Sequence, residues 1–136
     1  MLRQILSVLA GLLTVSIVVG LVQALGHYAI PMPQGLDADD PDVVKNYVDE
    51  NPMAMVFVLL SYAAGAFLGG FVATLIAKDN SRSPVFIIGA LYILVTIYMM
   101  FIIPSPFWFW VLGIAVWGLV FVGRTMARNI YRKKLK

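Results

Sequence analysis

The sequence predicts an all-α protein, a four-helix bundle that spans a membrane. Hydrophobic residues make up 61% of the 136 residues and charged residues only 12%, whereas a soluble domain is about 45–50% apolar and about 25% charged. A soluble fold of this length has too little interior to bury so much apolar surface, so we expect lipid to cover the excess. The apolar residues also form four continuous blocks, unlike the short alternating segments of a membrane β-barrel.

Each apolar block is close to the length of a membrane-spanning helix, about 20 residues at ~1.5 Å each. The first far exceeds the 7–15 apolar residues of a signal peptide, so we expect it to be retained as a span. The last is short, and we expect its helix to continue into the charged residues that follow. The predicted spans are 5–30, 53–77, 85–103 and 107–123, with a loop at 31–52 and a basic tail at 124–136.

Proline pairs mark the expected helix starts. Asn51-Pro52, Ser83-Pro84 and Ser105-Pro106 precede the last three spans. In each, the Asn or Ser oxygen can accept an orphan backbone N–H, and proline suits the first helical position. Asp40-Pro41 predicts a further short amphipathic helix within the loop, suited to the membrane surface or the rim of the bundle. Its expected apolar stripe consists of Val43, Val44, Tyr47 and Val48.

The distribution of charge predicts one orientation. Nine of the ten Lys and Arg residues lie before the first block, between the second and third, or after the fourth, and six of the seven acidic residues lie in the loop 31–52. The positive-inside rule then places both termini in the cytoplasm and the acidic loop outside. The pI near 9.3 is therefore mostly a consequence of topology, and with no recognisable nucleic-acid-binding module we expect no nucleic-acid partner.

The sequence gives little support for catalysis. No Asp, Glu, Lys or Arg lies inside the four apolar blocks, although such residues usually mark proton relays and ion-coupling sites in membranes. The chain has no cysteine, and it lacks a catalytic triad, a phosphate-binding loop and an HExxH motif. The acidic run from Asp37 fails as a calcium loop, because Asp42 replaces the required glycine and Val48 the required glutamate. We expect no catalytic residue, no cofactor and no metal site.

The strongest single pattern is a stripe of small residues along the second block. It recurs every four positions as Ser61, Gly65, Gly69, Ala73 and Ala77, and Ala66 and Gly70 widen it. Helices associate in lipid through close packing, so small residues at this spacing predict a tight helix–helix contact. The partner helix can belong to the same chain, to a second copy or to another protein. Gly20 and Ala24 in the first block offer an internal counterpart.

Gln23 and His27 form a candidate polar site near the outer end of the first span. They are one turn apart and share a helix face. One interpretation is a pH-sensitive or substrate-facing pair, because histidine changes charge near neutrality. The other is an interfacial histidine that bonds to water and a loop carbonyl.

The basic tail is expected to extend the fourth helix. Clusters of 4–8 basic residues beside a membrane span attract anionic lipids of the cytoplasmic leaflet at about 1 kcal/mol per charge. The expected lipid contacts are Arg124, Arg128, Arg132, Lys133 and Lys134.

Three local patterns stand out together: Gly26-His27 followed by residues 31–37, then Gly69–Ala73, and then Ile103–Phe109. They resemble those of a group of small uncharacterised bacterial inner-membrane proteins with four transmembrane helices. The resemblance covers most of the chain and implies a multi-pass protein of the bacterial inner membrane, but no activity. Small multidrug exporters have a similar size, yet their essential glutamate in the first helix is missing here.

We therefore expect a non-enzymatic accessory or interaction subunit of a membrane complex. Its glycine stripe or outer loop would bind another membrane protein or a second copy. The alternative is a small passive transporter or channel formed by a homo-oligomer, with Gln23 and His27 at its outer mouth.

Overall fold

The structure is a computed structural model that describes residues 1–37, 39–78, 82–103 and 105–136. Within these ranges every regular element is helical. The elements are α1 (Leu2–Ala29), α2 (Pro41–Glu50), α3 (Pro52–Ala77), α4 (Ser83–Ile102), α5 (Phe107–Ala115), the 3₁₀ turn η1 (Val116–Gly118) and α6 (Leu119–Lys134). Four helices are long and apolar enough to cross a membrane, α5 to α6 counting as one. This confirms the all-α class and the four membrane-length helices.

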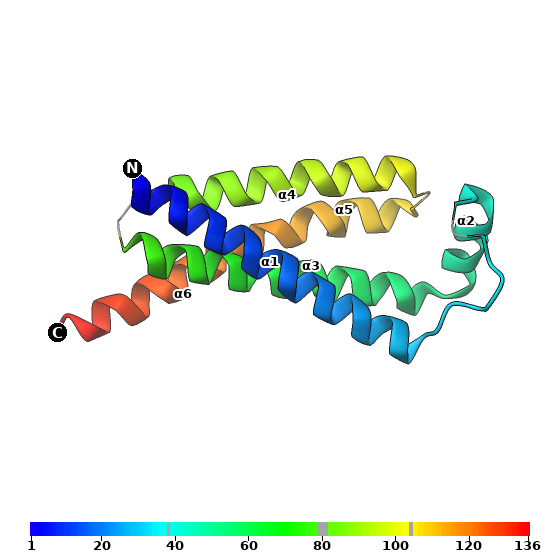
Figure 1. Cartoon of the computed structure of the whole chain (residues 1–136), viewed down its shortest axis with the longest axis horizontal. Helices are drawn as coiled ribbons and strands as arrows, with labels where there is room; N and C mark the ends of the chain where they lie inside the picture. Colours follow the sequence, from blue (N-terminus) through cyan, green and yellow to red (C-terminus); the bar gives the residue numbers. More distant parts are fainter. Residues whose placement is uncertain (38, 79–81, 104) are drawn as a thin grey trace.

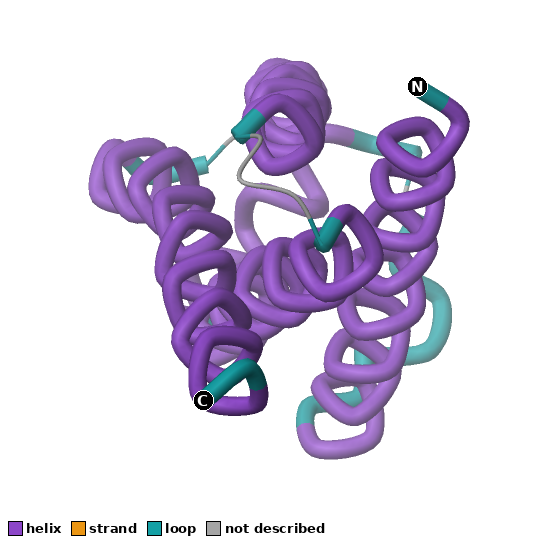
Figure 2. Tube along the Cα trace, turned by 90° about the vertical axis from the view of Figure 1, so that its left-hand side faces the viewer, coloured by secondary structure: helices purple, strands orange, loops and turns teal. Residues whose placement is uncertain are grey.

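The four long helices lie side by side and alternate in direction (Figure 1). Both termini lie at one end of the bundle, and α2 lies at the other. Seen along the bundle, α3 occupies the middle (Figure 2), where it packs mainly against α1 and α6. α3 is therefore the central helix, and it needs close-packing residues on two faces.

Most of the outer surface of the bundle is apolar. On α1, the side chains of Leu13, Ile17 and Leu21 are each at least 60% exposed, and only 17% of the most apolar 18-residue window of this helix is buried inside the chain. In water, each Å² of such surface would cost roughly 25 cal/mol. The exposure is what a helix in contact with lipid requires.

The centre of the bundle is filled by aromatic and aliphatic side chains around Trp117. The ring of Trp117 stacks on that of Tyr92 with centroids 4.9 Å apart, and its Nε1–H donates to Thr96 Oγ1 at 2.9 Å. The ring of Tyr62, in α3, lies tilted against the ring of Trp117, with centroids 5.6 Å apart. Trp117 lies in η1, a tighter turn that the sequence analysis did not predict. This cluster joins α3, α4 and the fourth long helix.

The predicted capping was right at one helix and wrong at three. Asp40 Oδ1 accepts from the backbone N–H of Asp42 at 3.0 Å, as expected for α2. Asn51 instead donates through Nδ2 to the Tyr47 carbonyl, and Ser105 donates to the Ile103 carbonyl. Ser83 is already inside α4. Asn51 and Ser105 directly follow the ends of the preceding helices, so their side chains reach carbonyl groups there, where the backbone offers more acceptors than donors.

Candidate functional site

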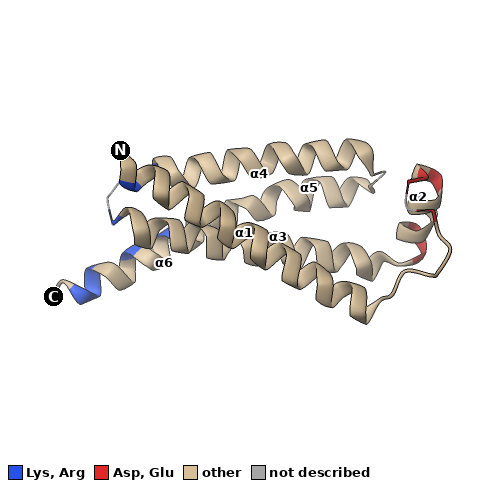
Figure 3. Ribbon diagram, in the orientation of Figure 1, with Lys and Arg blue, Asp and Glu red and all other residues tan. Residues whose placement is uncertain are grey.

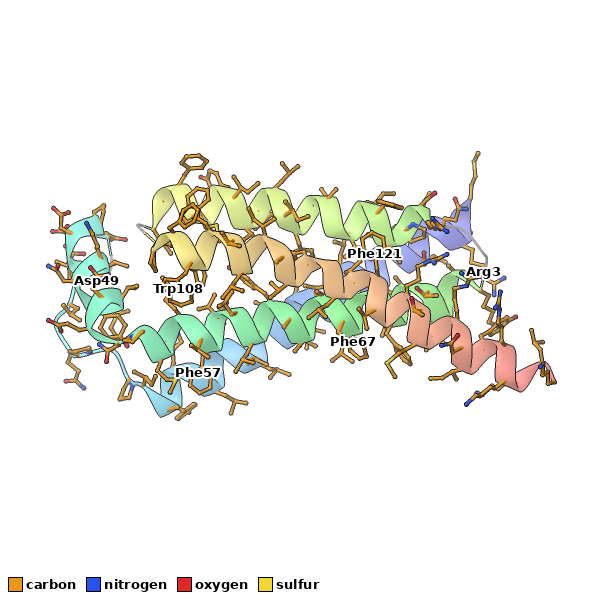
Figure 4. All side chains as sticks on the ribbon, turned by 180° about the vertical axis from the view of Figure 1, so that it is seen from behind. Arg3, Asp49, Phe57, Phe67, Trp108 and Phe121 are labelled. Atoms are coloured by element: carbon orange, nitrogen blue, oxygen red, sulfur yellow. The ribbon has the colours of Figure 1, made fainter. Side chains whose placement is uncertain are left out.

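The charged residues are separated in space as well as in sequence. Lys and Arg gather at the end that holds both termini, apart from Lys45 of α2, and the described Asp and Glu gather around α2 at the opposite end (Figure 3). Arg3 and Asp49 mark the two ends in Figure 4. Arg3 also joins two helices, because its Nε donates to the Ile76 carbonyl near the end of α3 at 3.1 Å. The bundle thus presents a basic end and an acidic end, and each is a candidate interaction surface.

The small-residue stripe of α3 lies against α1. All five of its residues (Ser61, Gly65, Gly69, Ala73 and Ala77) are buried. A Cβ atom added to Gly69 would clash with the side chain of Val15 and lie 3.2 Å from the Gly11 carbonyl oxygen. A Cβ atom on Gly65 would lie 2.9 Å from Val19 Cγ2. The stripe therefore packs α1 against α3 and is covered within the chain.

The counterpart on α1 differs from the one the sequence suggested. Around Gly20 nothing lies within 4 Å of an added Cβ atom, and Ala24 is exposed. Gly11 and Val15 lie against the stripe instead, and Ser7, one turn before Gly11, is also buried. Ser7 and Gly11 are themselves a small-xxx-small pair, and this was the signal that could have identified the correct register.

A second close contact, between α3 and α6, was missed. A Cβ atom on Gly70 would clash with the backbone carbonyl of Val120, and one on Gly123 would clash with the carbonyl of Phe67. The two backbones therefore touch directly, which only glycine permits. Gly123 and Ala127, both buried, form a small-xxx-small pair in the sequence that points to this contact.

Gln23 and His27 lie together in a shallow hollow between α1 and α3. The hollow has a volume of about 80 Å³ and is also lined by Gly26 and Phe57. Gln23 Nε2 donates to Ser61 Oγ at 3.4 Å, and the Ser61 hydroxyl donates to the Val58 carbonyl at 2.6 Å. His27 is exposed. The amide of Gln23 thus fastens α1 to α3, and the hollow is too small for more than a few water molecules.

The loop helix α2 is fastened to the acidic end by its apolar side. Val48 is 9% exposed and packs in a cluster with Met55, Met100 and Phe109. The Tyr47 hydroxyl donates to the carbonyl of Ile30 at 3.4 Å. The four charged residues of α2 are all exposed: Asp42, Lys45, Asp49 and Glu50. This arrangement presents a fixed, mainly acidic surface.

The basic residues of α6 differ in exposure. Arg132, Lys133 and Lys134 are exposed and Arg128 is partly buried. Arg124 is only 8% exposed, so it does not lie on the lipid surface as expected. The neighbouring Gly123 lets α6 approach α3 at backbone contact, and this draws Arg124 into the bundle.

No protein-family model, no curated protein and no solved structure matches the chain. Functional inference therefore depends on the two ends of the bundle and on its internal packing.

Proposed function

We propose that the protein is a non-enzymatic accessory subunit of a complex in the bacterial inner membrane, and that it binds its partner through α2. Both termini would lie in the cytoplasm and α2 outside. The orientation is supported by the separation of charge, since nine of ten basic residues lie away from the acidic loop and cytoplasmic ends carry the excess of Lys and Arg.

The main support for the proposal is that α2 is anchored to the bundle in a fixed position. Its apolar side is occupied by the bundle, its first turn is capped by Asp40, and its charged side is left open. A loop that served only to connect α1 and α3 would not need an anchored helix, because ordering each residue costs about 1–2 kcal/mol of backbone entropy. Three acidic residues against one lysine on α2 favour a basic segment of another membrane protein as the partner.

The small-residue stripe is a weaker candidate for this role. Gly65 and Gly69 are buried against α1, so another helix could reach them only if α1 left. The exposed faces of the long helices are covered by large aliphatic side chains, which suit lipid.

Photo-crosslinking tests the proposed surface. A photoreactive amino acid at Lys45 or Asn46, both exposed on α2, is expected to give one discrete adduct with another polypeptide in living cells. The matched control places the same group at Leu13 or Ile17, which are exposed on α1, and is expected to give none. A discrete adduct from α1 alone would contradict the assignment to α2.

A pore formed by several copies is less well supported. The centre of one copy is filled, with Val15, Ile88 and Val120 all 0% exposed, so a path would have to run between copies. His27 could line the mouth of such a path, but the outward residues of α1 below it include Ile17 and Leu21, which would leave the path without polar lining.

Cysteine labelling tests the orientation. The chain has no cysteine of its own, so Asn46→Cys and Leu135→Cys each create a single thiol at an exposed position. A membrane-impermeant maleimide added to spheroplasts is expected to label Cys at 46 and to leave Cys at 135 unlabelled until the membrane is opened. The reverse pattern would invert the proposed orientation.

A further inference from the structure

A cavity of about 240 Å³ opens between the last turns of α3 and α6. These turns lie at the basic end of the bundle (Figure 3). Three cationic side chains line it, Lys78 from the end of α3 and Arg128 and Arg132 from α6. Tyr131 adds a hydroxyl group, and Ala127 and Leu135 add apolar surface. None of the described lining residues is acidic.

Two of the three cations, Arg128 and Arg132, are one turn apart and so lie on the same face of α6, a spacing at which like charges destabilise a helix. Lys78 approaches the same cavity from the other helix. An anion in the cavity would turn this repulsion into attraction. A phosphate group suits it best, because planar guanidinium groups bind phosphate oxygens in pairs and an ammonium adds a point charge.

The backbone conformation of Lys78 is an independent indication that this residue has a functional role. Lys78 ends α3 in the left-handed conformation, with φ at 50°. Glycine is favoured there because a Cβ atom is strained. Among the described residues, Lys78 alone combines a side chain with positive φ. Strain of this kind is concentrated at functional positions, and here it occurs at a residue that lines the cavity.

We propose that this cavity binds a phosphate group, supplied either by the headgroup of an anionic phospholipid or by free phosphate. The mixed lining favours the lipid, because the cations can hold the phosphate while Ala127 and Leu135 contact the adjoining apolar part. The proposed site is a single cavity with defined lining residues. The attraction between the whole basic tail and the membrane, in contrast, is diffuse.

The test measures lipid binding to the full-length protein in a neutral detergent by native mass spectrometry. Phosphatidylglycerol is titrated, and the dissociation constant of the first adduct is determined. Two double variants each remove two positive charges: Arg128→Gln with Arg132→Gln inside the cavity, and Lys133→Gln with Lys134→Gln outside it. The cavity pair is expected to weaken binding about ten-fold more than the tail pair does.

Lys78→Gly provides a variant that is expected to fold normally. Glycine relieves the left-handed strain, so the melting temperature should stay equal or rise, while the affinity for phosphatidylglycerol should fall about five-fold. Displacement of the lipid by millimolar inorganic phosphate would identify free phosphate as the ligand, and resistance to it would identify the lipid headgroup. Equal losses from the two double variants, or unchanged binding by Lys78→Gly, overturn the proposal.

Discussion

Alanine in place of Gly70 or Gly123 is expected to destabilise the protein by about 1–3 kcal/mol, or to prevent folding. The obstacle to the new methyl group is the backbone of the facing helix, the Val120 carbonyl for Gly70 and the Phe67 carbonyl for Gly123. A side chain can rotate away from a methyl group, but a helical carbonyl moves only if the helix moves. α6 would therefore have to separate from α3, and the contact that brings Arg124 into the bundle would be lost.

The matched control is Gly20→Ala. It makes the same chemical change in a long helix, but nothing lies within 4 Å of the added Cβ atom. Alanine favours a helix by about 1 kcal/mol over glycine, so this variant should be as stable as the original protein or more so. The free energies of unfolding can be compared by titrating the purified proteins with sodium dodecyl sulfate and following their circular dichroism. Equal values for Gly20→Ala and Gly70→Ala would rule out direct contact between α3 and α6.

Trp117→Ala is expected to have the largest effect of any single truncation, about 3–5 kcal/mol. The Trp117 side chain is 1% exposed, stacks on Tyr92 and donates a hydrogen bond to Thr96. Its loss leaves a void among three helices, and it leaves the Thr96 hydroxyl without this donor. The measurement is the same detergent unfolding titration.

Two further variants separate the contributions of Trp117. Trp117→Phe keeps an aromatic ring and removes the donor. The lost hydrogen bond should cost about 0.6 kcal/mol, the average for hydrogen bonds between membrane helices, and at most about 1.7 kcal/mol. Trp108→Ala removes the same side chain from a position that is 41% exposed and should change stability little. A similar loss at both tryptophans would contradict the central position of Trp117.

The fold class could be read from the sequence because hydrophobic blocks of membrane length have few other structures available to them. The small-residue stripe of α3 was found for a similar reason, since Gly65 and Gly69 leave a groove at a regular spacing. The residues of the first helix that pack against this stripe were harder to predict from the sequence. The first helix carries two small-xxx-small pairs, Ser7 with Gly11 and Gly20 with Ala24, and the spacing alone does not rank them. The structure shows that Gly11 approaches α3, whereas nothing lies near Gly20.

The ends of the helices were the least predictable parts. Asn51 and Ser105 have side chains that can bond forwards or backwards along the chain, and the geometry of each short turn decides between the two. The burial of Arg124 was missed because a basic residue after an apolar block usually extends towards the head groups. Its position depends on Gly123, whose contact with α3 involves residues more than fifty positions earlier.

The separation of internal packing from the exposed ends limits where a partner can bind. The contact of α3 with α1 uses the stripe at Gly69, and its contact with α6 uses Gly70 and Gly123. These glycines therefore pack the helices of a single chain against one another. The acidic surface of α2 and the basic cavity at the opposite end remain exposed, and we propose the first as the site for a protein and the second as the site for a phosphate group.

The central claim is that α2 binds another protein. Its most direct test is native mass spectrometry of complexes released in mild detergent from cells that express the protein at its natural level. The comparison is between the original chain and a variant with Asp42→Asn, Asp49→Asn and Glu50→Gln, three exposed positions whose neutralisation leaves the apolar side of α2 unchanged. We predict a complex with one defined second polypeptide for the original chain, and its loss in the variant. A closed homo-oligomer, or a second polypeptide that the variant retains, would contradict the account.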